Sequence, residues 1–328
     1  MAATLTDSFG RRISYVRLSV TDRCDFRCRY CMAEEMHFLP KEQLLTFGEI
    51  EALVDLLVER GVTKVRLTGG EPLVRRGILD LVERLGRRLG RGLDELTLTT
   101  NGSQLAGAAE SLAASGIKRV NVSLDSLDPA KFAHITRRGR LDQVLGGIAA
   151  ARAANLRIKI NMVALRGVNQ DEIEPMLHWC GEQGFDLTLI ETMPLGEVEE
   201  RAEHFLSLDG VKRGLDGCFT LVPSLTRTGG PARYFDVAEL GVRLGFITPI
   251  SNNFCTGCNR IRVTATGTAY GCLGHNQRIE FRDLLRANDL AGANEALDGL
   301  IAGKPERHHF DIAAVTPAVE RHMSVTGG

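Results

Sequence analysis

The chain has 328 residues, of which 44% are hydrophobic and 25% charged, so it is long enough for one large domain or a domain with an accessory unit. Its formal net charge of −1 gives no global attraction for nucleic acid or for a membrane surface. No apolar run reaches the length of a membrane span, and residues 1–12 lack the apolar core of a secretory signal. These features predict a cytoplasmic protein, in which eight cysteines are more often ligands than disulfide partners.

Residues 13–193 alternate short β-branched runs with amphipathic helical runs. Strands are predicted at residues 13–20, 62–68, 95–100, 119–124, 156–163 and 187–192. Among the helices between them, 46–60 begins with the capping-box pair Thr46 and Glu49, and Asp128-Pro129 opens another. Strand–helix alternation over six units predicts a parallel sheet with right-handed crossovers.

The predicted strands alternate polar and apolar side chains, so only one face of the sheet is expected to meet helices. An open doubly wound sheet would instead show continuous apolar strands, because helices cover both of its faces. The polar face is expected to carry Arg17, Ser19, Lys64, Arg66, Thr68, Thr97, Thr99, Asn121, Ser123, Asp125, Lys159, Asn161, Glu191 and Met193. The pattern therefore predicts an α/β fold with an incomplete, three-quarter parallel βα barrel of six strands, left open on one side.

Four cations are predicted to point into this barrel: Arg17, Lys64, Arg66 and Lys159. No carboxylates are matched to them, and buried cations without partners are costly. An anionic ligand would explain them. The alternative is a set of solvated charges on an open sheet face.

The first predicted strand is followed by Cys24, Cys28 and Cys31, in a C-x3-C-x2-C spacing. This segment is too short and polar to form a core, but three thiolates can surround one inorganic centre. Thiolates select iron–sulfur clusters or zinc. Three cysteine ligands on a four-iron cubane would leave one iron without a protein ligand. The alternative interpretations are a structural zinc site and a chance grouping of cysteines.

The loop Gly69-Gly70-Glu71-Pro72 follows the second predicted strand. Carboxyl ends of parallel barrel strands form one rim, so this loop and the cysteine segment are expected to lie together. The glycines would let a ligand approach the backbone, and Glu71 could accept a hydrogen bond from an ammonium group.

After about residue 196 the pattern changes to short strands, predicted at 218–222, 232–235, 242–246 and 260–265. We expect a barrel over residues 1–217 and a smaller α+β unit over 218–328 that closes the open side. The second unit holds Cys255, Cys258 and Cys272, and His275 follows three residues later. This spacing is equally compatible with a Cys3His zinc site and with an iron–sulfur cluster.

Arg260 and Arg262 share a strand face directly after this second trio, which indicates an anion near the metal unless they are surface charges. Cys180 and Cys218 stand alone and are expected in the core. The terminal Gly327-Gly328, taken alone, predicts a frayed end, although it is thin enough to enter a crowded site.

Several motifs occur together: TDRCDFRCRYCM, VRLTGGEPLVR, LTTNG, NVSLDSL, KINMV, CTGCNRIRVTATG and the final Gly-Gly. In this combination the chain resembles the GTP 3′,8-cyclase family of the radical S-adenosylmethionine superfamily, over nearly its whole length and least over residues 197–230. These lyases open molybdenum cofactor (molybdopterin) biosynthesis. They convert GTP to 3′,8-cyclo-7,8-dihydro-GTP by abstracting the 3′ hydrogen and closing the ring onto C8.

The resemblance implies two 4Fe–4S clusters, one on Cys24, Cys28 and Cys31 and the other on Cys255, Cys258 and Cys272. The open iron of the first would chelate S-adenosylmethionine, and that of the second would face guanine, which leaves His275 without a ligand role. Positions expected around S-adenosylmethionine are Tyr30, Gly70, Ser123 and Met193, together with Glu71 of the same loop. Positions expected around GTP are Arg17, Lys64, Arg66, Thr99, Lys159, Arg260, Ile261 and Arg262.

By the same resemblance, Gly327 and Gly328 enter the active site, and Arg17 also assists late reduction or proton delivery. The implied partners are GTP, a flavodoxin- or ferredoxin-like electron donor and a downstream enzyme that forms cyclic pyranopterin, with no nucleic acid and no membrane. A homodimer is compatible with this assignment. The rival hypotheses are a radical enzyme that modifies peptides with an auxiliary cluster and a zinc-stabilised binding module without catalysis.

Overall fold

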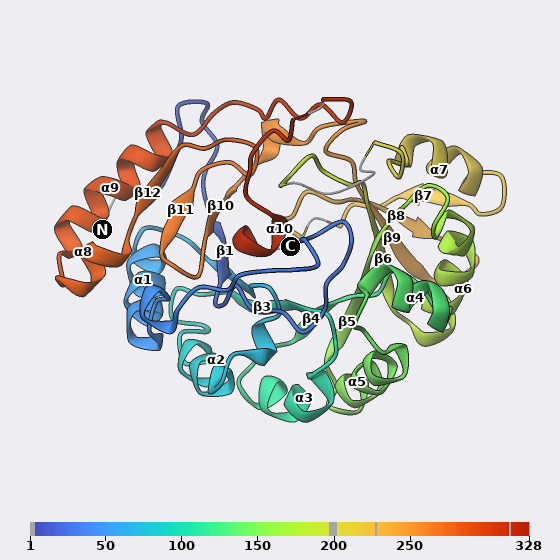
Figure 1. Ribbon diagram of the computed structural model, residues 1–328, viewed down its shortest axis with the longest axis horizontal. Helices are drawn as coiled ribbons and strands as arrows, with labels where there is room; N and C mark the ends of the chain where they lie inside the picture. Colours follow the sequence, from blue (N-terminus) through green and yellow to red (C-terminus); the bar gives the residue numbers. More distant parts are fainter. Residues whose placement is uncertain (1–3, 197–201, 227, 315, 328) are drawn as a thin grey trace.

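The computed structural model describes residues 4–196, 202–226, 228–314 and 316–327. In these ranges the strands form one twelve-stranded sheet in the order β12-β11-β10-β1-β2-β3-β4-β5-β6-β9-β8-β7 (Figure 1). The first six strands are β1 (Tyr15–Ser19), β2 (Lys64–Thr68), β3 (Glu95–Thr100), β4 (Arg119–Ser123), β5 (Arg157–Val163) and β6 (Asp186–Ile190). The others are β7 (Leu221–Pro223), β8 (Arg233–Val237), β9 (Val242–Ile247), β10 (Arg260–Val263), β11 (Thr268–Tyr270) and β12 (Arg278–Glu280).

The helices along the first half are α1 (Phe47–Glu59), α2 (Ile78–Gly86), α3 (Leu105–Ala114), α4 (Pro129–Thr136), α5 (Leu141–Ala153) and α6 (Ile173–Gln183). The later ones are α7 (Leu208–Leu215), α8 (Arg282–Arg286), α9 (Leu290–Ala302) and the short α10 (Met323–Thr326). In Figure 1 the sheet curves, helices α1 to α6 lie along its outer side, and α10 lies on its inner side.

All six strands predicted between residues 13 and 193 are present, and each is parallel to its sequence neighbour. The strands after residue 196 do not form a sheet of their own. Instead, β10 pairs with β1 and β9 pairs with β6, both in parallel, while β11, β12, β8 and β7 continue outward in antiparallel fashion. Both edges of the six-stranded sheet are thereby covered, which satisfies their exposed backbone groups.

The apolar face of the sheet packs against the helices. In α1, Ile50, Leu53, Val54 and Leu57 are fully buried against the core. The expected capping box is present, because the Thr46 hydroxyl accepts from Glu49 N at 3.2 Å and Thr46 N donates to the Glu49 carboxylate at 2.6 Å.

The sixth strand differs from its prediction. It ends at Ile190, and its register with β5 places Asp186, Thr188 and Ile190 on the polar face. Glu191 lies beyond the strand, where its carboxylate accepts from Leu208 N (3.1 Å) and from the backbone of the loop after β9. Strand alternation therefore does not apply to Glu191 and Met193, which lie beyond the strand, but both line a hollow at the strand end, on the side that was predicted.

The two isolated cysteines have different environments. Cys180 is buried in α6, as predicted. Cys218 is exposed, which corrects the expectation of a core residue. It lies in the turn after α7 rather than in a strand, and the neighbouring Phe219 takes the core position.

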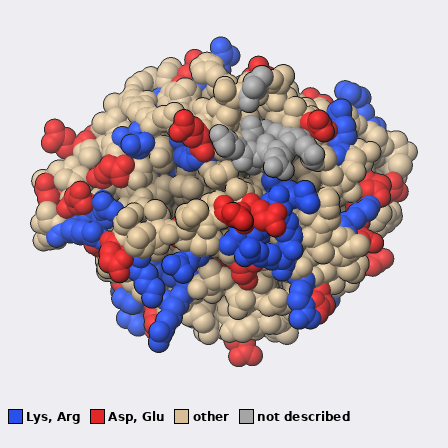
Figure 2. Space-filling view, in the orientation of Figure 1, with Lys and Arg blue, Asp and Glu red and all other residues tan. Residues whose placement is uncertain are grey.

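On the face shown in Figure 2, Lys and Arg side chains lie interspersed with Asp and Glu side chains, in keeping with the small net charge. Within the described ranges, none of the helices combines the length and the apolar character required to cross a bilayer.

Candidate active site

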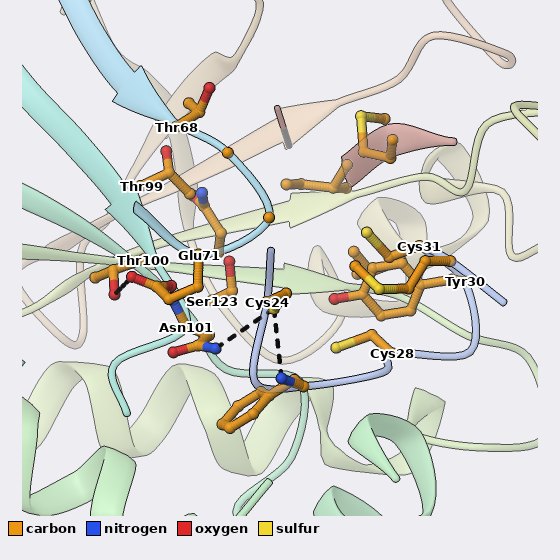
Figure 3. A pocket seen from close by; sticks show the side chains of 18 of the residues that line it. Cys24, Cys28, Tyr30, Cys31, Thr68, Glu71, Thr99, Thr100, Asn101 and Ser123 are labelled. Atoms are coloured by element: carbon orange, nitrogen blue, oxygen red, sulfur yellow. Dashed lines mark hydrogen bonds between the residues drawn. The ribbon is translucent and has the colours of Figure 1, made fainter. Parts of the chain in front are cut away.

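Two adjoining hollows hold the two cysteine trios. Cys24, Cys28 and Cys31 line the first, which lies at the carboxyl ends of the parallel strands (Figure 3). Cys255, Cys258 and Cys272 line the second. Three residues, Ile190, Met193 and Met323, line both hollows. Residues far apart in the sequence therefore face one continuous region.

Most of the predicted site residues line one of these hollows. The first is bordered by Tyr30, Gly70, Glu71, Thr99, Ser123 and Met193, and the second by Arg17, Arg260 and Arg262. Ile261 is different, because its side chain lies on the opposite face of β10, fully buried in the hydrophobic core. Any contact that Ile261 makes with a ligand must come from its backbone.

The loop after β2 fixes the start of the cysteine segment. Gly70 N donates to Thr21 O at 2.9 Å and Glu71 N donates to Arg23 O at 2.8 Å. A Cβ atom on Gly70 would overlap the Arg23 carbonyl. The glycine is thus required for close packing of two protein segments, a different reason from the ligand approach that the sequence indicated.

Glu71 joins this loop to the end of β3. Its carboxylate is almost fully buried and accepts hydrogen bonds from Leu73 N (3.0 Å), Thr100 Oγ1 (2.8 Å) and Asn101 N (2.6 Å) (Figure 3). Burial raises the pKa of Glu71 to about 7, although the Asn101 and Leu73 hydrogen bonds oppose the rise. The carboxylate therefore has three protein donors in addition to any ligand.

The first trio fits a metal cluster. Burial raises the pKa of both Cys24 and Cys31 to about 12 and that of Cys28 well above the ordinary value, so thiolates in this hollow need a cationic centre. Cys24 Sγ accepts from Phe26 N at 3.4 Å and faces Asn101 Nδ2 at 3.8 Å.

A zinc ion and a four-iron cubane place different demands on a cysteine trio. Over the ranges that the structure describes, no three His, Cys, Asp or Glu side chains converge closely enough to hold one metal ion. Zinc, with Zn–S bonds of about 2.3 Å, requires such convergence. A cubane does not, because each cysteine binds a different iron. His275 bonds through Nε2 to Arg307 O at 3.0 Å.

Tyr30 holds the last part of the cysteine segment. Its hydroxyl donates to Asp125 Oδ2 at 2.7 Å, and Asp125 also accepts from Val163 N at 2.8 Å. Burial raises the pKa of Asp125 to about 6, although these two hydrogen bonds lower it. The contact ties the segment to the ends of β4 and β5.

The strand register gathers the predicted cations on one face. Arg17 lies beside Arg66 on one side and Arg262 on the other, and Lys159 lies beside Asn121. Arg17, Lys159, Arg260 and Arg262 are all buried. Among the described residues, buried polar atoms without a hydrogen-bond partner include Arg17 Nε, Arg66 Nε, Thr68 Oγ1, Thr99 Oγ1 and Asn121 Oδ1. The two guanidinium nitrogens are donors that fit an anionic ligand, whereas the threonine hydroxyls and the Asn121 oxygen can bond to its other polar groups.

Tyr15 lies among the cations of this face, and its pKa shows their combined effect. It was not identified from the sequence. Burial alone would raise its pKa, but the neighbouring cations Arg66, Arg17, Lys64 and Arg260 together lower it to about 8. Tyr15 shares the strand alternation of Arg17, so extending the pattern by two residues would have found it.

One of the four predicted cations does have a carboxylate partner. Lys64 Nζ lies 2.7 Å from Glu95, which also pairs with Arg119 at 2.6 Å. The expectation that all four lack carboxylates was therefore wrong for Lys64. Glu95 shares the alternation of Thr97 and Thr99, so the same pattern could have revealed it.

The C-terminal segment enters the region between the trios. Arg262 Nη1 donates to Thr326 O at 3.3 Å and also to Gly327 O. Gly327 has φ +75°, and a Cβ atom there would overlap the Thr68 hydroxyl. Up to Gly327 the segment is thus packed rather than frayed, which corrects the expectation from the di-glycine taken alone. Gly328 lies outside the described residues.

This arrangement, with a cysteine trio after the first strand of a parallel sheet, defines a radical S-adenosylmethionine protein. Residues 18–180 match the Radical SAM superfamily, and residues 185–310 match the family described as Molybdenum Cofactor Synthesis C. The fold is shared with Streptococcus suis SuiB bound to S-adenosylmethionine (TM-score 0.60, 18% identity, 95% of this chain and 77% of that one). It is shared also with native anSMEcpe with bound AdoMet (TM-score 0.60, 15% identity, 88% and 82%).

Sequence relatives narrow the assignment. The chain is 58% identical to the GTP 3′,8-cyclase of Erythrobacter litoralis (strain HTCC2594), covering 100% of this chain and 99% of the relative. It is 55% identical to the GTP 3′,8-cyclase of Sinorhizobium medicae (strain WSM419), covering 99% and 95%. The chain belongs to the GTP 3′,8-cyclase family. Membership of the superfamily implies an iron–sulfur cluster and S-adenosylmethionine as cofactors.

Proposed function

We propose that this protein converts GTP to 3′,8-cyclo-7,8-dihydro-GTP, the first step of molybdenum cofactor biosynthesis, with a 4Fe–4S cluster on each cysteine trio. The observation that carries the proposal is that both trios line adjoining hollows, with buried cations beside them. When bound, the first cluster and S-adenosylmethionine supply the radical that takes the 3′ hydrogen, after which C3′ bonds to C8 of guanine.

The fold proposed for this chemistry is a six-stranded, three-quarter βα barrel over residues 1–217, closed on its open side by the α+β unit 218–328. The curvature of the sheet and the attachment of β9 and β10 to its two edges support this description. In this arrangement the second unit would keep water away from the reacting atoms.

In the first hollow, the S-adenosylmethionine site would comprise Tyr30, Gly70, Glu71, Ser123 and Met193. These residues border the first trio, so they would hold the cofactor beside the open iron. Glu71, whose carboxylate is already bonded to three donors, would mainly keep the loop in position for the cofactor's ammonium group.

The GTP site would take its phosphate contacts from the buried cations. The residues proposed are Arg17, Lys64, Arg66, Thr99, Lys159, Arg260, Arg262 and the backbone of Ile261. Holding the ribose near the adenosyl group is the main task of these residues, since positioning alone lowers such barriers by several kcal/mol.

Arg17, Gly327 and Gly328 are proposed as catalytic residues. Burial lowers the pKa of Arg17 to about 10, which brings its guanidinium closer to the range in which it can give up a proton in the late steps. Gly327 lies against Thr68 and Arg262, and so the tail would help to enclose the substrate.

The test is anaerobic incubation of the iron- and sulfide-reconstituted protein with GTP, S-adenosylmethionine and dithionite. Mass spectrometry should then find 5′-deoxyadenosine together with an isomer of GTP. Replacing Cys24, Cys28 and Cys31 by alanine should remove half of the iron and all of the product. Cys218→Ala, an exposed cysteine outside both trios, is the matched control and should change neither.

Cofactor cleavage that does not depend on GTP would contradict the proposal and point to a peptide substrate. Zinc in place of iron at the second trio would point to a binding module. The electron would come from a flavodoxin- or ferredoxin-like donor, and the product would pass to a pyranopterin-forming enzyme. A reducing compartment such as the cytoplasm suits eight cysteines that are all free in the structure.

A further inference from the structure

Lys304 is a buried cation directly beneath the second cysteine trio. It follows the C-terminal end of α9 and is only 2% exposed. Its ammonium group donates to Cys258 Sγ at 3.4 Å, to Arg260 O at 3.2 Å and to Gly271 O. An ammonium has three N–H donors, and these three acceptors use all of them. The position of the charge is therefore fixed.

No carboxylate balances this charge within the ranges that the structure describes. Lys304 forms no ion pair there, and its partners are two backbone carbonyls and a sulfur atom. A buried cation without a counter-charge is costly. A thiolate at Cys258 would supply that charge, because its sulfur accepts a hydrogen bond from the Lys304 ammonium at 3.4 Å.

The first trio has different surroundings, because no cation bonds to its sulfur atoms among the described residues. The donors to Cys24 Sγ are neutral, namely Phe26 N and the Asn101 amide. Carboxylates lie close to these thiols: Asp25 Oδ1 is 4.0 Å from Cys24 Sγ, and Asp125 accepts from the hydroxyl of Tyr30, the residue before Cys31. The first trio therefore has both carboxylates and the guanidinium of Arg27 nearby, the latter bonded to Cys24 O at 2.7 Å, whereas at the second trio a cation bonds directly to a ligand sulfur.

We propose that Lys304 is a positioning residue that holds Cys258 as a cluster ligand and raises the reduction potential of the second cluster above that of the first. The inference rests on the second cluster of the proposed function. Reduction adds negative charge to a cluster, so a fixed cation and a hydrogen bond to a ligand sulfur stabilise the reduced state. Carboxylates near the first cluster oppose its reduction in the same way.

The test is an anaerobic redox titration followed by electron paramagnetic resonance. It uses full-length protein in which Cys24, Cys28 and Cys31 are alanine, so that the signal comes from the second trio alone. Lys304→Met keeps the aliphatic chain but removes the charge, whereas Lys304→Arg keeps the charge. Lys212→Met, on α7 and paired with Asp216, is the control.

We expect Lys304→Met to lower the ratio of reduced to oxidised second cluster at least tenfold at a fixed potential, which corresponds to about 59 mV for a one-electron couple. Lys304→Arg should restore most of this ratio, and Lys212→Met should leave it unchanged. In otherwise wild-type protein, the second cluster should accept an electron before the first.

The remaining outcomes of the titration either support or overturn the proposed role of Lys304. Full iron in Lys304→Met with an unchanged potential overturns this inference and leaves the two-cluster proposal intact. Absence of iron once the first trio is removed overturns both. If iron is lost in Lys304→Met but kept in Lys304→Arg, the result supports the proposal that the Lys304 charge positions Cys258 as a cluster ligand. Iron lost in both variants would assign Lys304 to packing alone and overturn the inference.

Discussion

We expect the affinity for GTP to fall as the pH rises above 7, because of Lys159. Burial, followed by the charges of Arg119 and Arg66, lowers the pKa of Lys159 to about 7 in the unliganded protein. Bound triphosphate would stabilise the protonated ammonium, so GTP binding takes up a proton whenever Lys159 starts neutral. The groups that face Lys159 are Arg66, Arg119, Arg243, Asp186 and the Tyr234 hydroxyl.

The size of the effect follows from the pKa of about 7. At pH 6 nearly all of Lys159 is already protonated, whereas at pH 8 about one molecule in eleven is. The dissociation constant should therefore rise about tenfold between pH 6 and pH 8. Proton uptake on binding should be about 0.5 at pH 7 and about 0.9 at pH 8.

The assay is anaerobic calorimetry of GTP binding in buffers of different ionisation enthalpy. GTP loses a proton of its own near pH 6, which affects every variant alike. The comparison is therefore with Lys159→Met, which should bind about tenfold more weakly than wild type at pH 6 and lack its additional pH dependence. Lys118→Met, on the surface one residue before β4, should behave as wild type.

Two results would refute this reasoning. One is the absence of proton uptake at pH 8. The other is an identical pH profile for wild type and Lys159→Met. Without ligand the sign is different: the unfolded chain holds the proton up to a higher pH, so the contribution of Lys159 to stability rises from about pH 7 upward. Below about pH 7 the unliganded Lys159→Met variant should be more thermally stable than wild type, because it lacks the buried charge. This difference in stability should decrease as the pH rises above 7.

Three further predictions concern single substitutions. Thr46→Ala removes the cap of α1 and should cost about 1 kcal/mol in the free energy of unfolding from urea midpoints; no loss would mean that the cap is redundant. Gly327→Ala forces a side chain onto Thr68 at a positive φ and should reduce turnover about tenfold or more, because the strained tail moves away from the site. Full activity would show that the tail can shift without effect on the reaction. Asp7→Ala removes the carboxylate 2.6 Å from the buried Arg11, whose guanidinium keeps only backbone carbonyls as acceptors among the described residues, and should cost about 3 kcal/mol in a denaturant titration. A cost below about 1 kcal/mol would show that these carbonyls or water compensate the charge.

The parts of the site that the sequence could reveal depend on local patterns. Alternation along each strand was enough to place Arg17 and Arg66 on one face, because neighbouring parallel strands share their alternation. The order of strands and loops was enough to bring the cysteine segment and Gly70 to one rim.

The remainder depends on contacts between distant segments. Alternation failed at Glu191, because backbone donors from residues 250 and 251 draw it out of the strand. Cys218 was misplaced because a turn, rather than an apolar strand, holds it. Lys304 carries no local signal, since nothing near it in the sequence shows that its ammonium meets Cys258, 46 residues away.

The covering of both sheet edges by β9 and β10 has a consequence for how the chain folds. Until residues 242–263 have been synthesised, the nascent sheet exposes hydrogen-bonding groups along β1 and β6, and such groups invite intermolecular pairing. Pairing between strands about 245 residues apart also gives the fold a high contact order, which is typical of slow folding. Truncation after β6 should therefore yield aggregates rather than a smaller working enzyme.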